Sequence, residues 1–200
     1  MANDRVYIRH EIVANQHTQL ILPMIDSVLA EAGLTKQALS AIAVDEGPGS
    51  FTGLRIGMGV AQGLAFGLNL PIYPISSLQA LAHQANISDG SIYTAIDARM
   101  EKAYWAKYEI KDCAISTVHK PQLSAMSFLH TLRDQDASAI FVGSAFQDVD
   151  PLYPHAQAIA QLALLKIKQG KPGIQSVEVK PVYLRDKVAE KSKKGSSLYS

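Results

Sequence analysis

The sequence lacks the features of a secreted or membrane protein. Its 200 residues include a single cysteine, Cys113, which cannot form a disulfide within the chain. No apolar run approaches the roughly 18 uninterrupted residues that a membrane-spanning helix needs. The opening segment, MANDRVYIRH, also lacks the apolar core of a secretory signal. We therefore expect a cytoplasmic protein that does not insert into a membrane.

A large net charge is absent as well. The chain has 19 basic and 18 acidic residues, so it has no overall field that would concentrate a polyanion. Basic residues are densest from residue 185 onward, among Ser and Gly, which predicts a solvated tail. Tight, direct binding of nucleic acid is therefore not expected, and a role near RNA would be indirect.

Apolar residues make up 48% of the chain, enough for a core, and their spacing predicts an α/β protein. A first strand is expected at residues 6–12, where apolar side chains alternate and His10 falls on the apolar face as a core histidine. Helices are then expected at 19–32, 53–68 and 77–84, and strands at 41–44 and 72–75. Capping residues, glycine and proline mark the ends of these elements.

A change of pattern near residue 88 predicts a second unit. Antiparallel strands are expected at 91–97, 102–110 and 113–119, with Cys113 packed in the last of them. The following elements are a helix at 124–133, a strand at 139–142, a helix at 154–169 and a short strand at 181–185. We therefore place one domain at 1–88 and a second at 89–200, whose final residues could pack back on the first.

The helix at 19–32 carries more apolar surface than one contact with a sheet would cover. Ile21, Ile25 and Val28 form one stripe, and Met24 lies among the residues that widen it. This helix therefore needs two packing partners. One is its own domain, and the other is either a second helix of the chain or another subunit.

The helix at 53–68 has almost no side chains along two of its ridges. Each interior glycine costs about 0.5 to 1 kcal/mol relative to alanine, so close packing against another backbone must compensate. The pattern leaves open whether the chain's own sheet and first helix, or a partner, approaches these ridges. Small residues recur every four positions in two series, Gly53, Gly57, Ala61 and Ala65, and Gly59, Gly63 and Gly67.

A glycine-rich turn, DEGPGSFTG, precedes this helix and has some features of a phosphate site. Free N–H groups and the helix dipole attract phosphate at such turns. The lysine of a Walker loop is absent, however, and Asp45 and Glu46 would each repel a unit charge by roughly 3 kcal/mol at about 5 Å. The alternative is a tight turn in which Thr52 caps the helix. The candidate phosphate-binding residues are Gly47, Gly49, Ser50, Thr52 and Gly53.

No other segment contains a complete catalytic arrangement. The histidines lack the spacing of a helix-borne zinc peptidase site, and no G-x-S-x-G elbow is present. Asp97, Arg99 and Glu101 cluster at a predicted hairpin end, where a carboxylate could hold magnesium in a phosphotransferase. A solvated hairpin end is the alternative. We therefore expect no catalytic residue and no metal site.

The segments HTQLILPMIDSVLAEAGL, EGPGSFTGLRIGMGVAQGLAFG, AIDARMEKAYWAKYE and PVYLR follow one another along most of the chain. Together they closely resemble the bacterial TsaB (YeaZ) family, in the family's order. The resemblance implies a two-domain actin-like ATPase (ribonuclease H-like) fold, of the kind found in sugar kinases and heat-shock ATPases. The family was formerly grouped with glycoproteases.

The resemblance implies a non-catalytic scaffold subunit in the threonylcarbamoyladenosine modification of tRNAs that read codons starting with A. In this family TsaB binds the transferase TsaD and the ATPase TsaE, and it also forms homodimers. ATP and magnesium would then belong to the partner subunits, with no cofactor on this chain, and tRNA would be contacted only indirectly. The alternative is a nucleotide-dependent phosphotransferase or ATPase that uses the 47–53 turn. Peptidase activity is not expected.

The family's partner surface is built from the first two helices of the N-terminal domain. In this sequence those helices match residues 19–32 and 53–68, which agrees with their excess apolar surface and bare ridges. The resemblance therefore implies a partner-binding set made of Ile21, Met24, Ile25, Val28, Gly53, Gly57, Val60, Ala61 and Leu64.

Three departures from the family pattern are visible. Family members start with a strand of the type ILAIDTATEACSVAL, whereas this sequence starts with MANDRVYIRH, so we expect the first sheet to lack that strand and to have an exposed edge. The connection between VGSAFQDV and DPLYPHAQAIAQ is shorter than usual. Asp45 stands where relatives generally have glycine, which makes the phosphate-binding turn vestigial.

Overall fold

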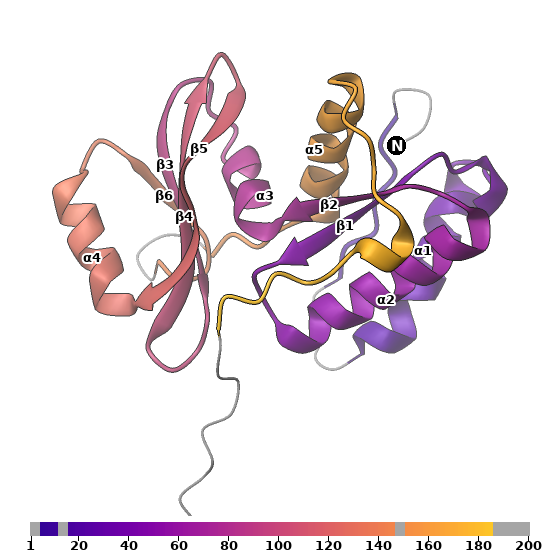
Figure 1. The fold of residues 1–200 in the computed structure, drawn as a ribbon, viewed down its shortest axis with the longest axis horizontal. Coiled ribbons are helices and arrows are strands. Elements are labelled where there is room, and N and C mark those ends of the chain that lie inside the picture. Colours follow the sequence, from indigo (N-terminus) through magenta and orange to yellow (C-terminus); the bar gives the residue numbers. More distant parts are fainter. Residues whose placement is uncertain (1–4, 12–15, 147–150, 186–200) are drawn as a thin grey trace, which may run out of the picture.

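The computed structural model describes residues 5–11, 16–146 and 151–185. In this part of the chain two β-sheets lie side by side, and helices cover them (Figure 1). None of the helices in these ranges is long and apolar enough to cross a membrane.

The first sheet is a parallel pair of strands, β1 (Ile42–Gly47) and β2 (Ile72–Ser76). The crossover between them is α2 (Phe51–Leu68), which covers one face of the pair. Met58 and Ala65 of α2 are buried in this contact. The predicted strand–helix–strand order is therefore confirmed.

The opposite face of the first sheet is covered by α5 (Ala156–Lys168), which comes from far along the chain. Ile159 and Leu162 of α5 pack against Tyr73 and Ile75 of β2. A parallel sheet needs cover on both faces, because both carry apolar side chains. Although α5 follows the second sheet in sequence, it therefore packs as part of the first unit.

The second sheet has four strands in the order β5-β4-β3-β6. Three of them form the predicted antiparallel meander, and the fourth pairs parallel to β3. Leu78 of α3 (Ser77–Gln84) packs on one face, and Leu129 of α4 (Met126–Gln135) packs on the other. The strands are β3 (Gly90–Asp97), β4 (Lys102–Lys111), β5 (Ala114–Ala125) and β6 (Ile140–Val142).

The helix predicted at 19–32 is confirmed as α1 (His17–Glu31), which packs against α2. Leu29 is the one residue that α1 buries. Gly33 follows the helix with a left-handed φ of +66°, as expected for a helix end. A short 3-10 turn, η1 (Lys36–Ala38), then leads to β1.

Residues 174–185 form an extended segment that we call the C-terminal strap. Ile174 makes a bridge to Ile72 at the outer edge of β2, and η2 (Ser176–Glu178) lies beside α2. Further along, the Val182 N–H donates to the Glu46 carbonyl oxygen at 2.7 Å. The strap thus follows the first unit closely.

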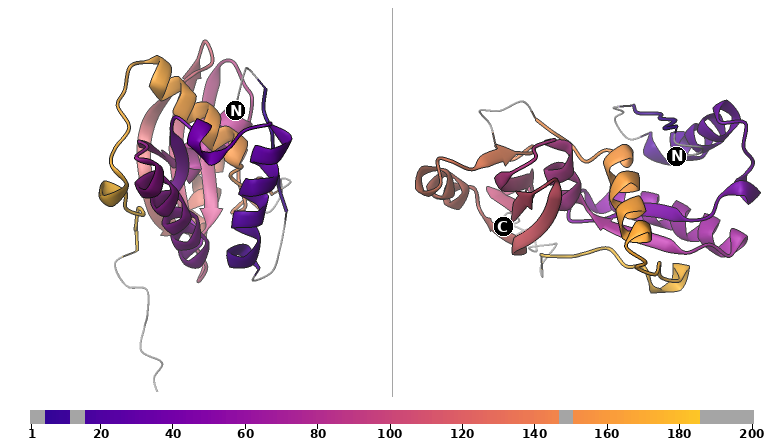
Figure 2. Two further views of the ribbon diagram at one scale, coloured as in Figure 1. Left: turned by 90° about the vertical axis from the view of Figure 1, so that its right-hand side faces the viewer. Right: turned by 90° about the horizontal axis from the view of Figure 1, so that it is seen from above.

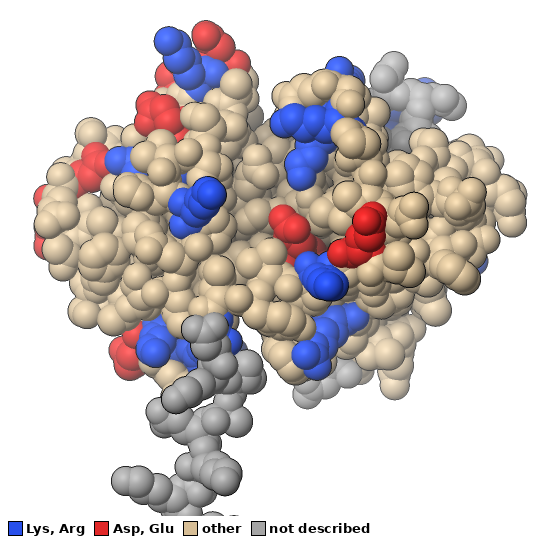
Figure 3. All heavy atoms as spheres, in the orientation of Figure 1, with Lys and Arg blue, Asp and Glu red and all other residues tan. Residues whose placement is uncertain are grey.

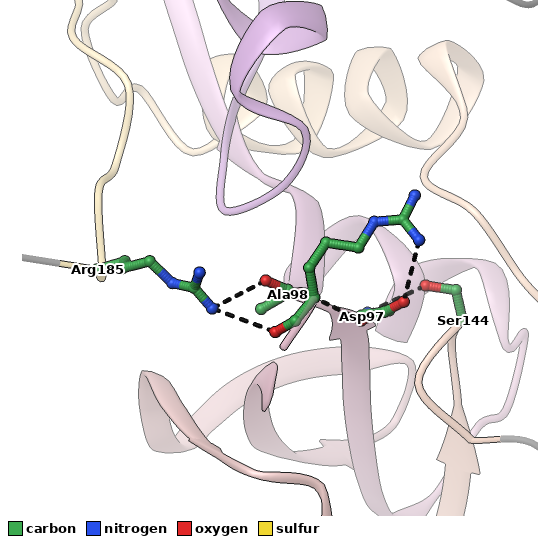
Figure 4. A network of polar contacts seen from close by, with 5 residues as sticks. Asp97, Ala98, Ser144 and Arg185 are labelled. Carbon is green, nitrogen blue, oxygen red and sulfur yellow. Dashed lines mark hydrogen bonds and ion pairs between the residues drawn. The ribbon is translucent and has the colours of Figure 1, made fainter. Parts of the chain in front are cut away.

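The end of the strap reaches the second sheet through Arg185. Its guanidinium donates to the carbonyl oxygens of Ala98 and Arg99 in the β3–β4 turn (Figure 4). In this turn Arg99, Met100 and Glu101 all have positive φ angles. Such conformations cost about 1 to 3 kcal/mol each outside glycine, so the Arg185 contacts stabilise a strained turn and join the two units.

The strand predicted at 6–12 is wrong within the described residues 5–11, which are mostly exposed and make no strand. Arg9 instead binds α1, where its guanidinium contacts the Ser27 hydroxyl and the Glu31 carboxylate. These contacts hold the segment along the helix. His10 is exposed and stacks on His155 with ring centroids 4.2 Å apart, so it is not a core histidine.

Two further local predictions are wrong. Cys113 is exposed in the turn between β4 and β5, with a φ of +62°, and does not pack in a strand. Residues 181–185 form no strand, and they make only isolated hydrogen bonds as part of the strap, from Val182 to the first unit and from Arg185 to the second. The predicted solvated tail after residue 185 lies outside the described residues.

Gly143 lies where the chain after β6 passes close to β3. Its φ is +119°, and a Cβ atom there would lie 2.0 Å from the Ala95 carbonyl oxygen. We predict that Gly143→Ala lowers the free energy of unfolding by more than about 3 kcal/mol, because backbone must move. Gly170→Ala is the matched control, since φ is +70° but the space is open, and it should cost about 1 kcal/mol. Urea unfolding measures both, and equal losses would contradict the close approach.

Candidate partner-binding surface

The residues predicted to bind a partner gather around one cleft, which we call the α1–α2 cleft. It has a volume of about 640 Å³ and lies between α1, α2, β1, the start of α5 and the N-terminal residues 6–9 and 11. Most members of the set are half-buried. The cleft is lined by all of them, Ile21, Met24, Ile25, Val28, Gly53, Gly57, Val60, Ala61 and Leu64.

The prediction that the Ala61 side chain is accessible to a partner is wrong. Ala61 is 6% exposed and belongs to the core cluster that also contains Met58, Ala65 and Val44. Met58 and Ala65 lie one helical turn before and after it, so Ala61 is on the face of α2 that contacts the sheet. A partner therefore has little access to this side chain.

The second glycine series of α2 faces away from the rest of the chain. A Cβ atom at Gly59, Gly63 or Gly67 would meet nothing within 4 Å outside the local helix backbone. These positions are exposed, and Phe66 beside them is 76% exposed. The four-residue spacing identified this series in the sequence, but its outward orientation was not predictable. We call Gly59, Gly63, Gly67 and Phe66 the glycine ridge.

In the glycine-rich turn between β1 and α2, the Asp45 carboxylate accepts a hydrogen bond from a backbone N–H group that a phosphate would need. One oxygen of the Asp45 carboxylate accepts hydrogen bonds from the Gly47 N–H at 2.8 Å and from the Ser77 hydroxyl at 2.5 Å. Ser77 was not among the predicted site residues, and no local sequence pattern links it to Asp45. A phosphate at this turn would have to compete with the carboxylate for the same N–H group.

The helix end of the turn is also capped internally. The Ser50 hydroxyl accepts from the Gly53 N–H at 3.3 Å, and this is the N-cap contact of α2. Ser50, not Thr52, is therefore the cap. A second N–H group that an anion would need is already used.

Two acidic groups at the turn further oppose anion binding. Burial raises the pKa of the Asp45 carboxyl, although hydrogen bonds from Ser77 and Gly47 offset part of the effect. Burial also raises the pKa of Glu46, against the influence of the nearby Lys166 charge. The turn thus presents half-buried carboxyl groups where a phosphate would need positive charge.

Asp97, the magnesium ligand of the alternative hypothesis, is held by its neighbours (Figure 4). Its carboxylate accepts from the Arg99 N–H at 2.7 Å and lies 3.7 Å from the Arg99 guanidinium. The Asp97 N–H donates to the Ser144 hydroxyl at 3.3 Å. Among the residues that the structure describes, no group of three or more His, Cys, Asp or Glu side chains could hold a metal ion. Further ligands are therefore not brought to Asp97.

Comparisons with known sequences identify relatives along most of the chain. A family model described as TsaD, tRNA N6-adenosine threonylcarbamoyltransferase, matches residues 8–141. The tRNA threonylcarbamoyladenosine biosynthesis protein TsaB of Haemophilus influenzae is 34% identical over 214 residues, which cover 93% of this chain and 87% of that protein. TsaB of Escherichia coli is 34% identical over 217 residues, which cover 96% of this chain and 91% of that protein.

Solved structures share the fold. A Pseudomonas aeruginosa protein described as similar to peptidase YEAZ superposes with a TM-score of 0.79 at 32% identity, over 88% of each chain. YeaZ from the same organism superposes with a TM-score of 0.76 at 32% identity, also over 88% of each chain. The α/β, actin-like fold that the sequence resemblance implied is therefore confirmed.

The raised pKa of Asp45 predicts that the contribution of this residue to the free energy of unfolding depends on pH. An acid whose pKa rises on folding stabilises the protein fully below its unfolded pKa, here near 3.8, and this contribution is lost as the pH rises through the folded pKa. Asn keeps the accepting oxygen but does not titrate. We therefore predict that, between about pH 4 and pH 8, the wild type loses more stability in urea unfolding than Asp45→Asn does.

Asp134→Asn, at an exposed position of α4, is the control for this measurement. It also removes one carboxylate, and its stability should follow the wild type across the pH range. Parallel curves for the wild type and Asp45→Asn would contradict the burial effect.

Proposed function

The chain belongs to the TsaB family of tRNA threonylcarbamoyladenosine biosynthesis proteins, and we propose that it serves this pathway as a non-catalytic scaffold. In this role it binds a TsaD-type transferase and a TsaE-type ATPase. It also pairs with a second copy of itself. The surface that supports these contacts is formed by α1 and α2.

The glycine ridge is the observation on which this function rests most. Gly59, Gly63 and Gly67 lie inside a helix, yet nothing within 4 Å would meet a Cβ atom at any of them. At about 0.5 to 1 kcal/mol each, they weaken α2 by roughly 1.5 to 3 kcal/mol relative to alanine. Packing within the described chain does not compensate for this. A partner helix that approaches at short backbone separation would supply the missing contacts.

We infer that the ridge takes one helix at a time, because its three glycines recur every four residues along one side of α2. Phe66 is 76% exposed beside it, and an exposed aromatic side chain is the kind of residue that anchors an interface. A second copy of the chain and a transferase subunit would therefore compete for the ridge. In this proposal, the homodimer and the heteromeric complex are alternative states.

Contacts at the two candidate chemical sites favour a scaffold over an enzyme. Asp45 and Ser50 occupy N–H groups of the glycine-rich turn. Asp97 is paired with Arg99. We therefore assign ATP and magnesium to the partner subunits, and the phosphotransferase alternative gains no support from these contacts.

The charge distribution supports an indirect relation to tRNA. On the face drawn in Figure 3, Lys and Arg side chains are interspersed with Asp and Glu and do not form one broad basic area. The whole chain has 19 basic and 18 acidic residues. Because phosphate contacts dominate affinity for nucleic acids, we assign tRNA binding to the partner subunits.

We predict that Gly63→Leu abolishes copurification with a TsaD-type transferase and converts the homodimer to a monomer. The leucine side chain occupies the space through which a partner backbone would approach. It also has a higher helix propensity than glycine, so the free chain should become more stable by up to about 1 kcal/mol. Pull-down and analytical ultracentrifugation measure binding, and urea unfolding measures stability.

His130→Leu provides the control, because His130 is exposed on α4 in the other unit. It adds the same side chain elsewhere and should leave both complexes intact. If folded Gly63→Leu binds its partners as the wild type does, the glycine ridge is not the interface.

A further inference from the structure

Arg55 is the one charged residue of α2, although one side of this helix is exposed. α2 has 18 residues and contains no Asp, Glu or Lys. The Arg55 side chain is itself exposed, and it lies four residues before Gly59, the first glycine of the ridge. Residues four apart share one face of a helix. A helix that packed along the glycine ridge would therefore pass beside Arg55.

Two aromatic side chains hold the Arg55 guanidinium in one orientation. Its Cζ atom lies 3.7 Å from the ring centroid of Phe51, in the position of a cation–π contact. Its Nε–H donates to the hydroxyl of Tyr183 at 3.0 Å. An arginine held in this way loses less conformational freedom on binding than a free one does. The side chain is therefore preorganised for a ligand.

Tyr183 belongs to the C-terminal strap, which is anchored on both sides of this residue. The Val182 N–H is bonded to β1 in the first unit, and the Arg185 guanidinium is bonded to the β3–β4 turn in the second. Figure 2 shows the strap on one side of α2 and α1 on the other. The anchored strap thus keeps the Tyr183 hydroxyl beside α2, where it orients Arg55.

The two Nη groups of Arg55 have no acceptor among the described residues. The contact with Tyr183 is its one hydrogen bond there, and no described Asp or Glu forms an ion pair with it. The Nη groups of an arginine form the fork that binds two oxygens of a carboxylate or a phosphate. A site for one anionic group is therefore present beside the glycine ridge.

A carboxylate suits this position better than a nucleic-acid phosphate does. A nucleic-acid strand requires several positive charges along its path, whereas Arg55 supplies the one charge of α2. The open space at Gly59 and Gly63 instead admits the backbone of another helix. An Asp or Glu on that helix would bring one negative charge to the one positive charge of α2.

A second copy of the chain does not offer such a group on its own α2. In a homodimer formed through the glycine ridges, each α2 would face another helix without Asp or Glu. Each Arg55 would then be covered without gaining an ion pair, which disfavours this pairing. A partner helix with a carboxylate at the matching position has the advantage.

We propose that Arg55 binds a carboxylate on the helix of the transferase-type partner and so selects this partner over a second copy. The inference rests on the proposed function, in which the partner helix packs on the glycine ridge. Burial at the interface would remove the water that weakens exposed ion pairs, and the fork would make the pair bidentate. Phe51 and Tyr183 are positioning residues for the guanidinium.

Arg55→Gln tests the pair, because it keeps a hydrogen-bonding group but removes the charge and the fork. We expect this variant to bind the transferase-type partner at least about tenfold more weakly in calorimetric titration. The dissociation constant of its homodimer, measured by analytical ultracentrifugation, should not change. Lys111→Gln, at an exposed position of β4 in the second unit, is the charge-matched control and should change neither constant. Equal weakening of the homodimer would overturn selection by Arg55.

Amide variants of the partner identify the carboxylate. Each Asp and Glu on the partner's interface helix is changed singly to Asn or Gln, and each variant is titrated with the wild type and with Arg55→Gln. One of them should weaken binding to the wild type about tenfold and have no further effect on Arg55→Gln. Additive losses at every position would overturn the pair. Arg55→Lys keeps the charge without the fork and takes the place of Arg55→Gln if that variant does not fold.

The outcomes also separate this proposal from the scaffold function. If the wild-type chain does not bind the transferase-type partner, the proposed function fails and the inference fails with it. If the wild type binds and folded Arg55→Gln binds equally well, the inference alone fails. A loss of affinity for tRNA with unchanged affinity for the partner protein would assign Arg55 to a phosphate and overturn the carboxylate.

Discussion

The burial of both faces of the β1–β2 pair is the constraint on which the other features depend. A two-stranded parallel sheet is not stable alone. Here α2 covers one face and α5 the other, and Ile72 and Ile75 are fully buried between them. This arrangement turns the glycine ridge of α2 outward and places the α1–α2 cleft beside β1. It also positions the glycine-rich turn between the end of β1 and the start of α2.

Most helices and strands could be predicted from the sequence because their signals are local. α3 begins at Ser77 and ends at Gln84, as capping and periodicity indicated. The strand predicted at 6–12 is not formed by the described residues 6–11, because alternation does not specify a pairing partner, and Arg9 instead binds α1. The packing of α5 on the first sheet was not predictable, since an apolar helix face does not specify which sheet it covers.

The candidate surface was predicted better by residue type than by orientation. The excess apolar surface of α1 indicated a second neighbour, and the structure places Ile21, Ile25 and Val28 around the cleft. A four-residue spacing does not tell which series of α2 faces the core, so Ala61 was assigned outward although it is buried. Long-range contacts were equally hidden, because Ser77 reaches Asp45 only after β2 pairs with β1.

The position of α5 in the sequence has a consequence for synthesis on the ribosome. Translation completes β1, α2 and β2 long before α5, which begins at Ala156. Until that helix emerges, the face of β2 with Tyr73 and Ile75 has no cover, and Arg185 of the strap arrives later still. The N-terminal half therefore cannot close as a nascent domain. Its uncovered apolar face is the surface that a chaperone at the exit tunnel would meet.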